Sequence, residues 1–253
     1  MPALQDAVIA TFLIFCRVGG CLIFAPGLSS SRIPMQVRLF IAIGLSLAVV
    51  PMLLASMAAS LVPAPGAKFF QLVLTESLTG ALLGLMGRCF LLAAQFAAIF
   101  IANVIGLAGI PGIPLEDAEG STPLASLLSM STTMLLLASG AHIEMLRAII
   151  DSYSAIPPRP ALEWDWLARN LTSALAETSL LALRLAAPFA LYSILVNLAI
   201  GLAGKFTPQL QIYFISTGAT LVGGLFILML LAPDWLGLAT GAYWSWLREG
   251  SLE

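Results

Sequence analysis

Charged residues are scarce in this sequence. Asp, Glu, Lys and Arg make up 9% of the 253 residues, whereas soluble globular domains carry about 25%. Hydrophobic residues account for 60%, and the mean hydropathy is +1.00. Such a chain cannot cover its surface with charge, so lipid or other protein must cover it. The net charge is −2 and no basic run occurs, which makes nucleic acid a poor candidate partner.

Residues of the types that bind metals or catalyse reactions are also few. There is one histidine, and the three cysteines have neither metal-ligand nor disulfide spacing. We interpret the cysteines as small apolar residues. The sequence has no nucleophile–base set and no glycine-rich phosphate loop. These absences argue against an enzyme, and we expect neither a cofactor nor a metal.

Long runs without charged residues are prominent in the sequence. Five runs lack Asp, Glu, Lys, Arg and His, and each reaches the roughly 20 residues that a helix needs to cross a bilayer. A sixth apolar stretch, residues 7–28, contains a single charge, Arg17. Strand periodicity is absent, and a helix in lipid satisfies its own backbone hydrogen bonds. We therefore predict an all-α, membrane-associated fold of about six long helices, some kinked or broken. The uncharged runs are 39–67, 89–115, 120–141, 185–204 and 206–233.

Turn signals place the predicted helices. Pro51 is expected to kink the second helix, and the IPPRP motif at 156–160 is expected to end the fourth. Gly80 and Gly84 have the spacing that lets another helix approach the third closely. The predicted helices cover residues 7–27, 37–61, 69–105, 123–153, 178–204 and 209–232.

The whole chain is interpreted as one domain. Two tryptophan-bearing segments are expected at a membrane or partner interface. The predicted segments are N-terminal helices at 1–105, a plug-like loop at 106–122, a central helix at 123–156, a linker and amphipathic helix at 157–177, a C-terminal helical hairpin at 178–233 and an interfacial tail at 234–253.

Several charges lie within the apolar helices, where a charge is costly unless it faces protein or water. Glu76 and Arg88 are twelve residues apart on one helix, too far to touch, and Glu177 and Arg184 are two turns apart. We expect their partners, and that of Arg17, on other helices or other chains. They are either coupling groups of a small-solute transporter or ion pairs across the contacts of an assembly, and the assembly is favoured. Loop charges also divide almost equally between the two sides of a six-span topology, which is unusual for a transporter.

The single histidine, His142, is close in sequence to three charged residues. Arg147 and Asp151 are four residues apart, a spacing at which the two side chains can pair on one helix. A proton relay through His142 is conceivable, but a hydrogen-bonded structural histidine at a helix end is the favoured interpretation.

Three stretches together resemble the FliR family of flagellar biosynthetic proteins. RVGGCLIFAPGLSSSRIPMQVRL has the arginine of the family's first helix, then Ala-Pro, a basic residue, a proline and a Val-Arg pair. SGAHIEMLRAIIDSYSAIPP is similar to the family's Gly-x-His helix and its linker ending in proline. LRLAAPFALYSILVNLAIGLAGKFTPQLQIYF looks like a proline-bearing helix followed by a basic residue and Pro-Gln-Leu. The matches occur in order and cover nearly the whole chain.

The resemblance implies a subunit of the export gate of the bacterial flagellar type III secretion apparatus. Members assemble with FliP-type and FliQ-type subunits into a helical channel in the flagellar basal body at the inner membrane, beside an FlhB-type subunit and the basal-body ring. Exported flagellar proteins pass through this channel unfolded, and membrane lipid is a further expected contact. A virulence injectisome subunit and, from another class, a small-solute secondary transporter stay as alternatives. Expected buried or subunit-contact charges are Arg17, Arg38, Glu76, Arg88, His142, Glu177, Arg184 and Lys205.

In this family the loop after the long third helix acts as a channel plug. The corresponding segment here, NVIGLAGIPGIPLEDAEGSTP, runs over 103–123. Its glycines allow reshaping, its prolines prevent helix continuation, and its aliphatic side chains can close a narrow pore by excluding water. An ordinary helix–helix connector is the alternative. The expected plug residues are Ile105, Gly106, Leu107, Gly109, Ile110, Pro111, Gly112, Ile113 and Pro114.

Overall fold

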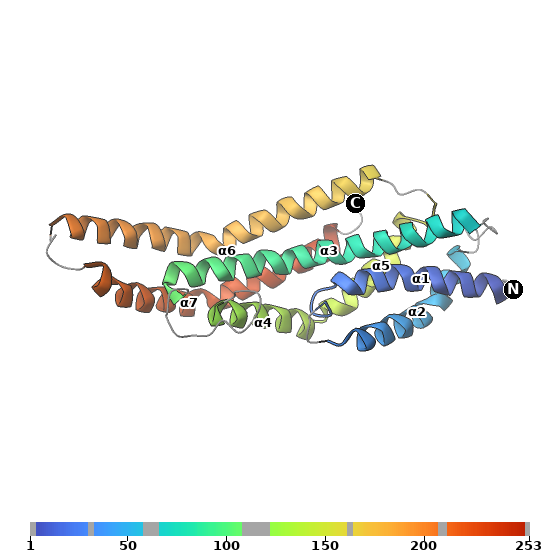
Figure 1. Cartoon of the computed structure of the whole chain (residues 1–253), viewed down its shortest axis with the longest axis horizontal. Coiled ribbons are helices and arrows are strands. Elements are labelled where there is room, and N and C mark those ends of the chain that lie inside the picture. Colours follow the sequence, from blue (N-terminus) through green and yellow to red (C-terminus); the bar gives the residue numbers. More distant parts are fainter. Residues whose placement is uncertain are drawn as a thin grey trace. The chain divides into compact units, whose positions relative to one another are not determined.

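The computed structural model describes residues 4–29, 33–57, 66–107, 122–160, 164–206 and 212–250, and the regular secondary structure in these ranges is entirely helical. These residues form α-helices and a final π-helical turn, with no strand among them, and this confirms the all-α prediction (Figure 1). The elements are α1 (Leu4–Phe24), α2 (Met35–Met57), α3 (Gly66–Ile105), α4 (Pro123–Ala138), α5 (Ala141–Ala155), α6 (Trp164–Phe206), α7 (Ile212–Ser245) and the π-helix η2 (Trp246–Gly250).

Two of the helices are much longer than a bilayer requires. α3 has 40 residues and α6 has 43, and each is a single unbroken ribbon in Figure 1. At 1.5 Å per residue each is about 60 Å long, roughly twice the hydrocarbon thickness of a membrane. Five of the described helices are long and apolar enough to cross a membrane, or six if α4 and α5 count together as one span.

The C-terminal half differs from the predicted segments because two helices continue past their predicted limits. The predicted amphipathic helix at 157–177 is the first part of α6, and α7 runs through Pro233 to Ser245 instead of ending near 232. A helix can continue through a proline where neighbouring groups satisfy the freed carbonyl. Trp235 and Trp246 are buried, so the prediction of an interfacial tail was wrong for these two tryptophans.

A break interrupts the predicted central helix 123–153. α4 and α5 are separated at Ser139 and Gly140 and are bent by 66° relative to each other. Gly140 has φ of 84°, a left-handed conformation that glycine adopts without a steric cost. α5 then ends at Ala155, directly before the IPPRP motif, as predicted.

The chain divides into two compact units, and the interpretation as one domain stays a prediction. Unit 1 contains Met1–Cys89, Leu136–Ala176 and Tyr243–Glu253, and unit 2 contains Phe90–Leu135 and Glu177–Ala242. The core of unit 1 comes from α1, α2, α3 and α5, with Leu13 and Ile14 fully buried. In unit 2, α3 contributes a stripe of small and β-branched residues, and α6 contributes Phe189. The buried residues of that stripe are Ala93, Ala94, Ala97, Ala98, Ile101, Ala102 and Ile105.

Candidate functional site

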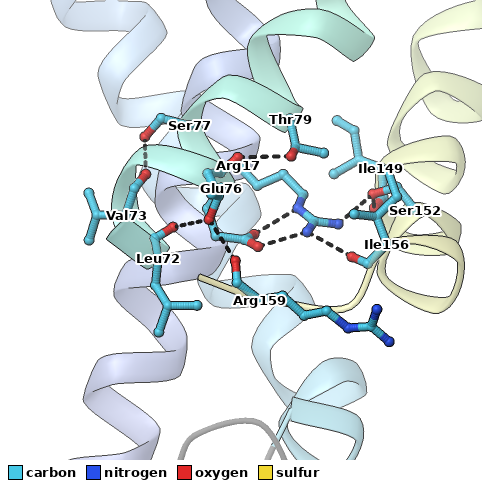
Figure 2. A network of polar contacts seen from close by, with 11 residues as sticks. Arg17, Leu72, Val73, Glu76, Ser77, Thr79, Ile149, Ser152, Ile156 and Arg159 are labelled. Carbon is cyan, nitrogen blue, oxygen red and sulfur yellow. Dashed lines mark hydrogen bonds and ion pairs between the residues drawn. The ribbon is translucent and has the colours of Figure 1, made fainter. Parts of the chain in front are cut away.

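Arg17 is the centre of a buried polar cluster in unit 1. Its side chain leaves α1 and contacts Glu76 of α3 and, at the end of α5, Ser152 and Ile156 (Figure 2). Together with Tyr153, which lies against the guanidinium, we call these residues the Arg17 cluster. Arg17 and Ser152 are 0% exposed and Glu76 is 1% exposed. In a chain with so few charges, a fully buried arginine and glutamate are the most unusual feature of the described residues.

The ion pair of the Arg17 cluster is bidentate. Nε of Arg17 donates to Oε2 of Glu76 at 2.7 Å, and Nη2 donates to Oε1 at 2.8 Å. This fork arrangement matches the planar guanidinium to the planar carboxylate and is among the strongest hydrogen-bonded pairs in proteins. The pair joins α1 to α3 across 59 positions of sequence.

The same guanidinium also holds the C-terminal end of α5. Nη1 donates to Oγ of Ser152 at 3.0 Å, and Nη2 donates to the carbonyl oxygen of Ile156 at 2.9 Å. The Cζ atom lies 3.8 Å from the centre of the Tyr153 ring, in cation–π geometry. A positive charge at a helix C-terminus also offsets the negative end of the helix dipole, so Arg17 suits this position electrostatically.

Burial of these two charges is tolerated because they are partnered. Four of the five N–H groups of Arg17 donate to protein oxygens, and both carboxylate oxygens of Glu76 accept. A buried ion pair by itself is weak evidence of net stability. Removing one partner, however, leaves the other charge buried and unpaired, which lowers the free energy of unfolding by about 3–5 kcal/mol. The Arg17 cluster is therefore built to join three helices, and its geometry points to no reaction.

Glycines bring α1 and α3 close enough for the ion pair to form. A Cβ atom on Gly80 would lie 1.9 Å from the Arg17 carbonyl oxygen, and one on Gly84 would lie 2.3 Å from that of Cys21. On α1 the reciprocal position is Gly20, where an added Cβ atom would lie 2.5 Å from the Ser77 carbonyl oxygen. The two backbones are thus in direct contact, which confirms the close helix approach predicted from Gly80 and Gly84.

A second set of contacts holds the N-terminal end of α5, and sequence reasoning missed it. The hydroxyl of Tyr243 lies 3.5 Å from Sδ of Met145, and Nε1 of Trp244 donates to Oγ of Ser139 at 3.2 Å. Gly87 of α3 lies beside this arrangement, since a Cβ there would be in ordinary van der Waals contact with the Tyr243 hydroxyl at 3.4 Å. Tyr243 and Trp246 thus pack inside the protein and Trp244 is half-buried, although such aromatic residues are also typical of a membrane interface.

The other predicted charges lie in different environments. Arg38 and Arg88 are half-buried, whereas the remaining four side chains are exposed. The chain by itself does not bury these four side chains, and their expected role at subunit contacts or as charges buried in an assembly stays a prediction. The exposed residues are His142, Glu177, Arg184 and Lys205.

Two pairing predictions have clear outcomes. Glu76 pairs with another helix, as expected, and the partner is Arg17 of the same chain. The Arg147–Asp151 pair, which the spacing allows, is not the pair that forms, because Arg147 instead bonds Oε1 of Glu144 at 2.7 Å. An i,i+3 spacing on a helix allows this alternative as readily as i,i+4.

The structure describes only the beginning of the predicted plug. Ile105 is the last residue of α3 and is fully buried in unit 2, where it packs against Gly224 of α7. Gly106 has φ of 89° and ends the helix, and Leu107 is half-buried. The other predicted plug residues lie outside the described part of the chain: Gly109, Ile110, Pro111, Gly112, Ile113 and Pro114.

Among the described residues, no three His, Cys, Asp or Glu side chains come together in a way that could hold a metal ion. What the described geometry provides in unit 1 is a tight junction of α1, α3 and α5. Comparison with known proteins assigns the chain to a family. The model of the family described as "Bacterial export proteins, family 1" matches residues 8–244. The chain belongs to this family.

Several similar proteins share the name flagellar biosynthetic protein FliR. The chain is 28% identical over 218 residues to the flagellar biosynthetic protein FliR of Caulobacter vibrioides, covering 86% of each chain. It is 28% identical over 221 residues to FliR of Escherichia coli, covering 86% of this chain and 82% of that protein. With FliR of Aquifex aeolicus the identity is 22% over 232 residues, covering 90% and 87%.

Proposed function

We propose that this chain is the FliR-type subunit of the bacterial flagellar type III export gate, through which flagellar proteins leave the cell. The observation that carries the proposal is the family match over residues 8–244, together with several relatives named flagellar biosynthetic protein FliR. On this proposal the chain is a channel component with no catalytic role. It resides in the inner membrane at the flagellar basal body, with FliP-type and FliQ-type subunits as direct partners and an FlhB-type subunit nearby.

The uncovered apolar surface supports membership of an assembly. Between Ala190 and Phe206 no residue of α6 is buried, and Leu195 and Phe206 are 65% and 80% exposed. Only 11% of the apolar window in α6 is buried by the chain itself. Since soluble monomers rarely expose continuous apolar patches above a few hundred Å², other polypeptides or lipid must cover this helix. A multi-subunit gate in a membrane supplies both.

The Arg17 cluster weakens the transporter alternative. A proton-coupled transporter needs an ionisable group that can change its protonation state within the apolar body. Both carboxylate oxygens of Glu76 are engaged by Arg17, so this glutamate is committed to helix packing. The side chains of His142, Glu177, Arg184 and Lys205 are exposed, so the chain does not enclose them in its apolar body. The described residues therefore favour an assembly subunit over a solute carrier.

The segment after α3 is proposed as the plug of the channel. Gly106 ends α3 in a left-handed conformation, and this turns the chain out of the helix directly before the Gly- and Pro-rich stretch. The apolar residues that follow can exclude water from a narrow passage. Ile105, which is buried against α7, would hold the first residues of this plug in place.

Co-purification tests the proposed function. A tagged chain is expressed with its native chromosomal partners and extracted in a mild detergent. The expected result is one large complex that contains two different small membrane proteins, of the FliP and FliQ types. Recovery of the chain alone, or only as a small homo-oligomer, would contradict the proposal. A second readout is a deletion strain, which should fail to export flagellar proteins until the chain is restored.

A further inference from the structure

Two adjacent glycines of α7 in unit 2 face two different helices. A Cβ atom on Gly223 would lie 2.7 Å from the hydroxyl oxygen of Tyr192 on α6. A Cβ atom on Gly224 would lie 2.6 Å from Cγ1 of Ile105, the last residue of α3. Consecutive side chains of an α-helix point about 100° apart, so one turn of α7 packs against both neighbours. Both distances are too short for a Cβ atom, and therefore both positions require glycine in this packing.

The contact at Gly224 involves the stiff part of the Ile105 side chain. Besides Cγ1, the Cγ2 and Cβ atoms of Ile105 lie 3.1 and 3.2 Å from the position of a Gly224 Cβ. A β-branched residue in a helix has one strongly preferred χ1 rotamer, and Ile105 is 0% exposed, so its side chain cannot turn into free space. An extra methyl group at position 224 would therefore displace Ile105 by roughly 1 Å before ordinary contact distances return.

Tyr192 of α6 holds α7 at this same turn. Its hydroxyl donates to the carbonyl oxygen of Thr220 at 2.7 Å. In an α-helix that carbonyl oxygen also accepts the amide of the residue four positions later, which here is Gly224. The Tyr192 side chain is half-buried, and its ring packs where Gly223 leaves room for it. A side chain of α6 thus fixes the turn of α7 that receives Ile105.

We infer that Gly224 and Tyr192 are positioning residues of the channel plug: Gly224 receives Ile105, and Tyr192 holds the turn of α7 on which Gly224 lies. Gly106 follows Ile105 directly, and its φ of 89° turns the chain out of α3. A displacement of Ile105 therefore moves the point at which the plug segment leaves the helix. The inference rests on the proposed plug function of that segment, and it adds the residues of α6 and α7 that set the position of the plug.

Ion conductance of membranes that carry the complex tests the inference with two variants, each of which has a matched control. Gly224→Ala adds a methyl group against Ile105, whereas Gly218→Ala adds one on the same helix where a Cβ would meet nothing within 4 Å. Tyr192→Phe removes the hydroxyl that holds α7, whereas Tyr243→Phe removes a tyrosine hydroxyl of unit 1. We expect Gly224→Ala to raise the conductance at least about three-fold, because a displaced apolar plug excludes water less well. Tyr192→Phe should raise it less, because the ring stays in place, and both controls should conduct like the wild type.

A compensating variant separates positioning from a general loss of stability. Ile105→Ala combined with Gly224→Ala removes the two carbon atoms nearest to the new methyl group, and it should bring the conductance back toward the wild-type value. Every variant compared must join its complex at the wild-type yield, and Tyr192→Phe still tests the inference if Gly224→Ala does not meet this condition. Equal leakage of Gly224→Ala and Gly218→Ala, or no recovery in the double variant, would overturn the inference.

Deletion of residues 110–113 is the reference that tests the plug itself. If the deletion makes the membrane leaky while Gly224→Ala and Tyr192→Phe conduct like the wild type, the inference is wrong and the proposed plug stands. If the deletion leaves the conductance unchanged, the proposed plug and the inference fail together. The two failures are thus distinguished in one set of measurements.

Discussion

The backbone of Arg17 touches Gly80 where α1 and α3 meet. A Cβ atom on Gly80 would lie 1.9 Å from the Arg17 carbonyl oxygen, a distance at which the two helices must separate. The ion pair between Arg17 and Glu76 is formed less than two helical turns away along these same helices. Close backbone contact and a buried ion pair thus support each other in unit 1.

Gly80→Ala should destabilise the protein by about 1–3 kcal/mol, the usual cost of forcing an extra methyl group into a packed interface. Gly19→Ala is the matched control, because a Cβ at Gly19 would meet nothing within 4 Å. Alanine is the better helix former by about 1 kcal/mol, so the control should be neutral or slightly stabilising. The measurement is thermal unfolding in detergent, followed by circular dichroism. Equal melting temperatures for the two variants would show that α1 and α3 are not in contact at Gly80.

Removing one member of the ion pair should cost more than removing both. Arg17→Met alone leaves Glu76 buried without its partner, and we expect a loss of about 3–5 kcal/mol. Arg17→Met combined with Glu76→Leu replaces the pair by apolar side chains and should recover much of that loss. Unfolding free energies of the wild type, both single variants and the double variant form a complete cycle. Additive effects would mean that the two side chains do not interact.

Ser152 and Ser154 offer a comparison on a single helix. Each hydroxyl donates to the carbonyl oxygen three residues earlier, at 2.6 Å. Only Ser152 is buried and also accepts a hydrogen bond from Arg17. Ser152→Ala should therefore cost about 1–3 kcal/mol, as expected for a bond to a charged group, whereas Ser154→Ala should change stability by less than about 0.5 kcal/mol. A similar loss for both variants would remove Ser152 from the Arg17 cluster.

Local signals predicted parts of the fold well. The glycine spacing in α3 indicated a close helix approach, and α1 makes it through Gly20. The IPPRP motif correctly ended α5, since a proline restricts the residue before it and removes a backbone donor. Both features depend on a few residues that are close in sequence, so they could be predicted from the sequence alone.

Features that depend on distant residues were not predictable in detail. The sequence offered Glu76 several cationic partners, and nothing local selects Arg17, which is 59 positions away. Arg147 could pair with a carboxylate on either side, and the structure selects Glu144. The burial of Trp235 and Trp246 was missed because tryptophan suits both a core and a membrane interface. In each case tertiary packing decides between two locally acceptable arrangements.

The last prediction concerns the proposed plug, the segment that follows α3. Deleting residues 110–113 should leave the chain able to join its complex, because Ile105 and the helices that pack around it are unchanged. It should also make the membrane leaky to ions, since apolar residues that exclude water from a narrow passage are lost. The measurement is ion conductance of membranes that carry the complex, with co-purification as the check on assembly. A variant with the same four positions replaced by Gly and Ser keeps the loop length and should leak as well if apolar closure is the mechanism. Unchanged conductance in both variants, with assembly intact, would make the segment an ordinary connector between α3 and α4.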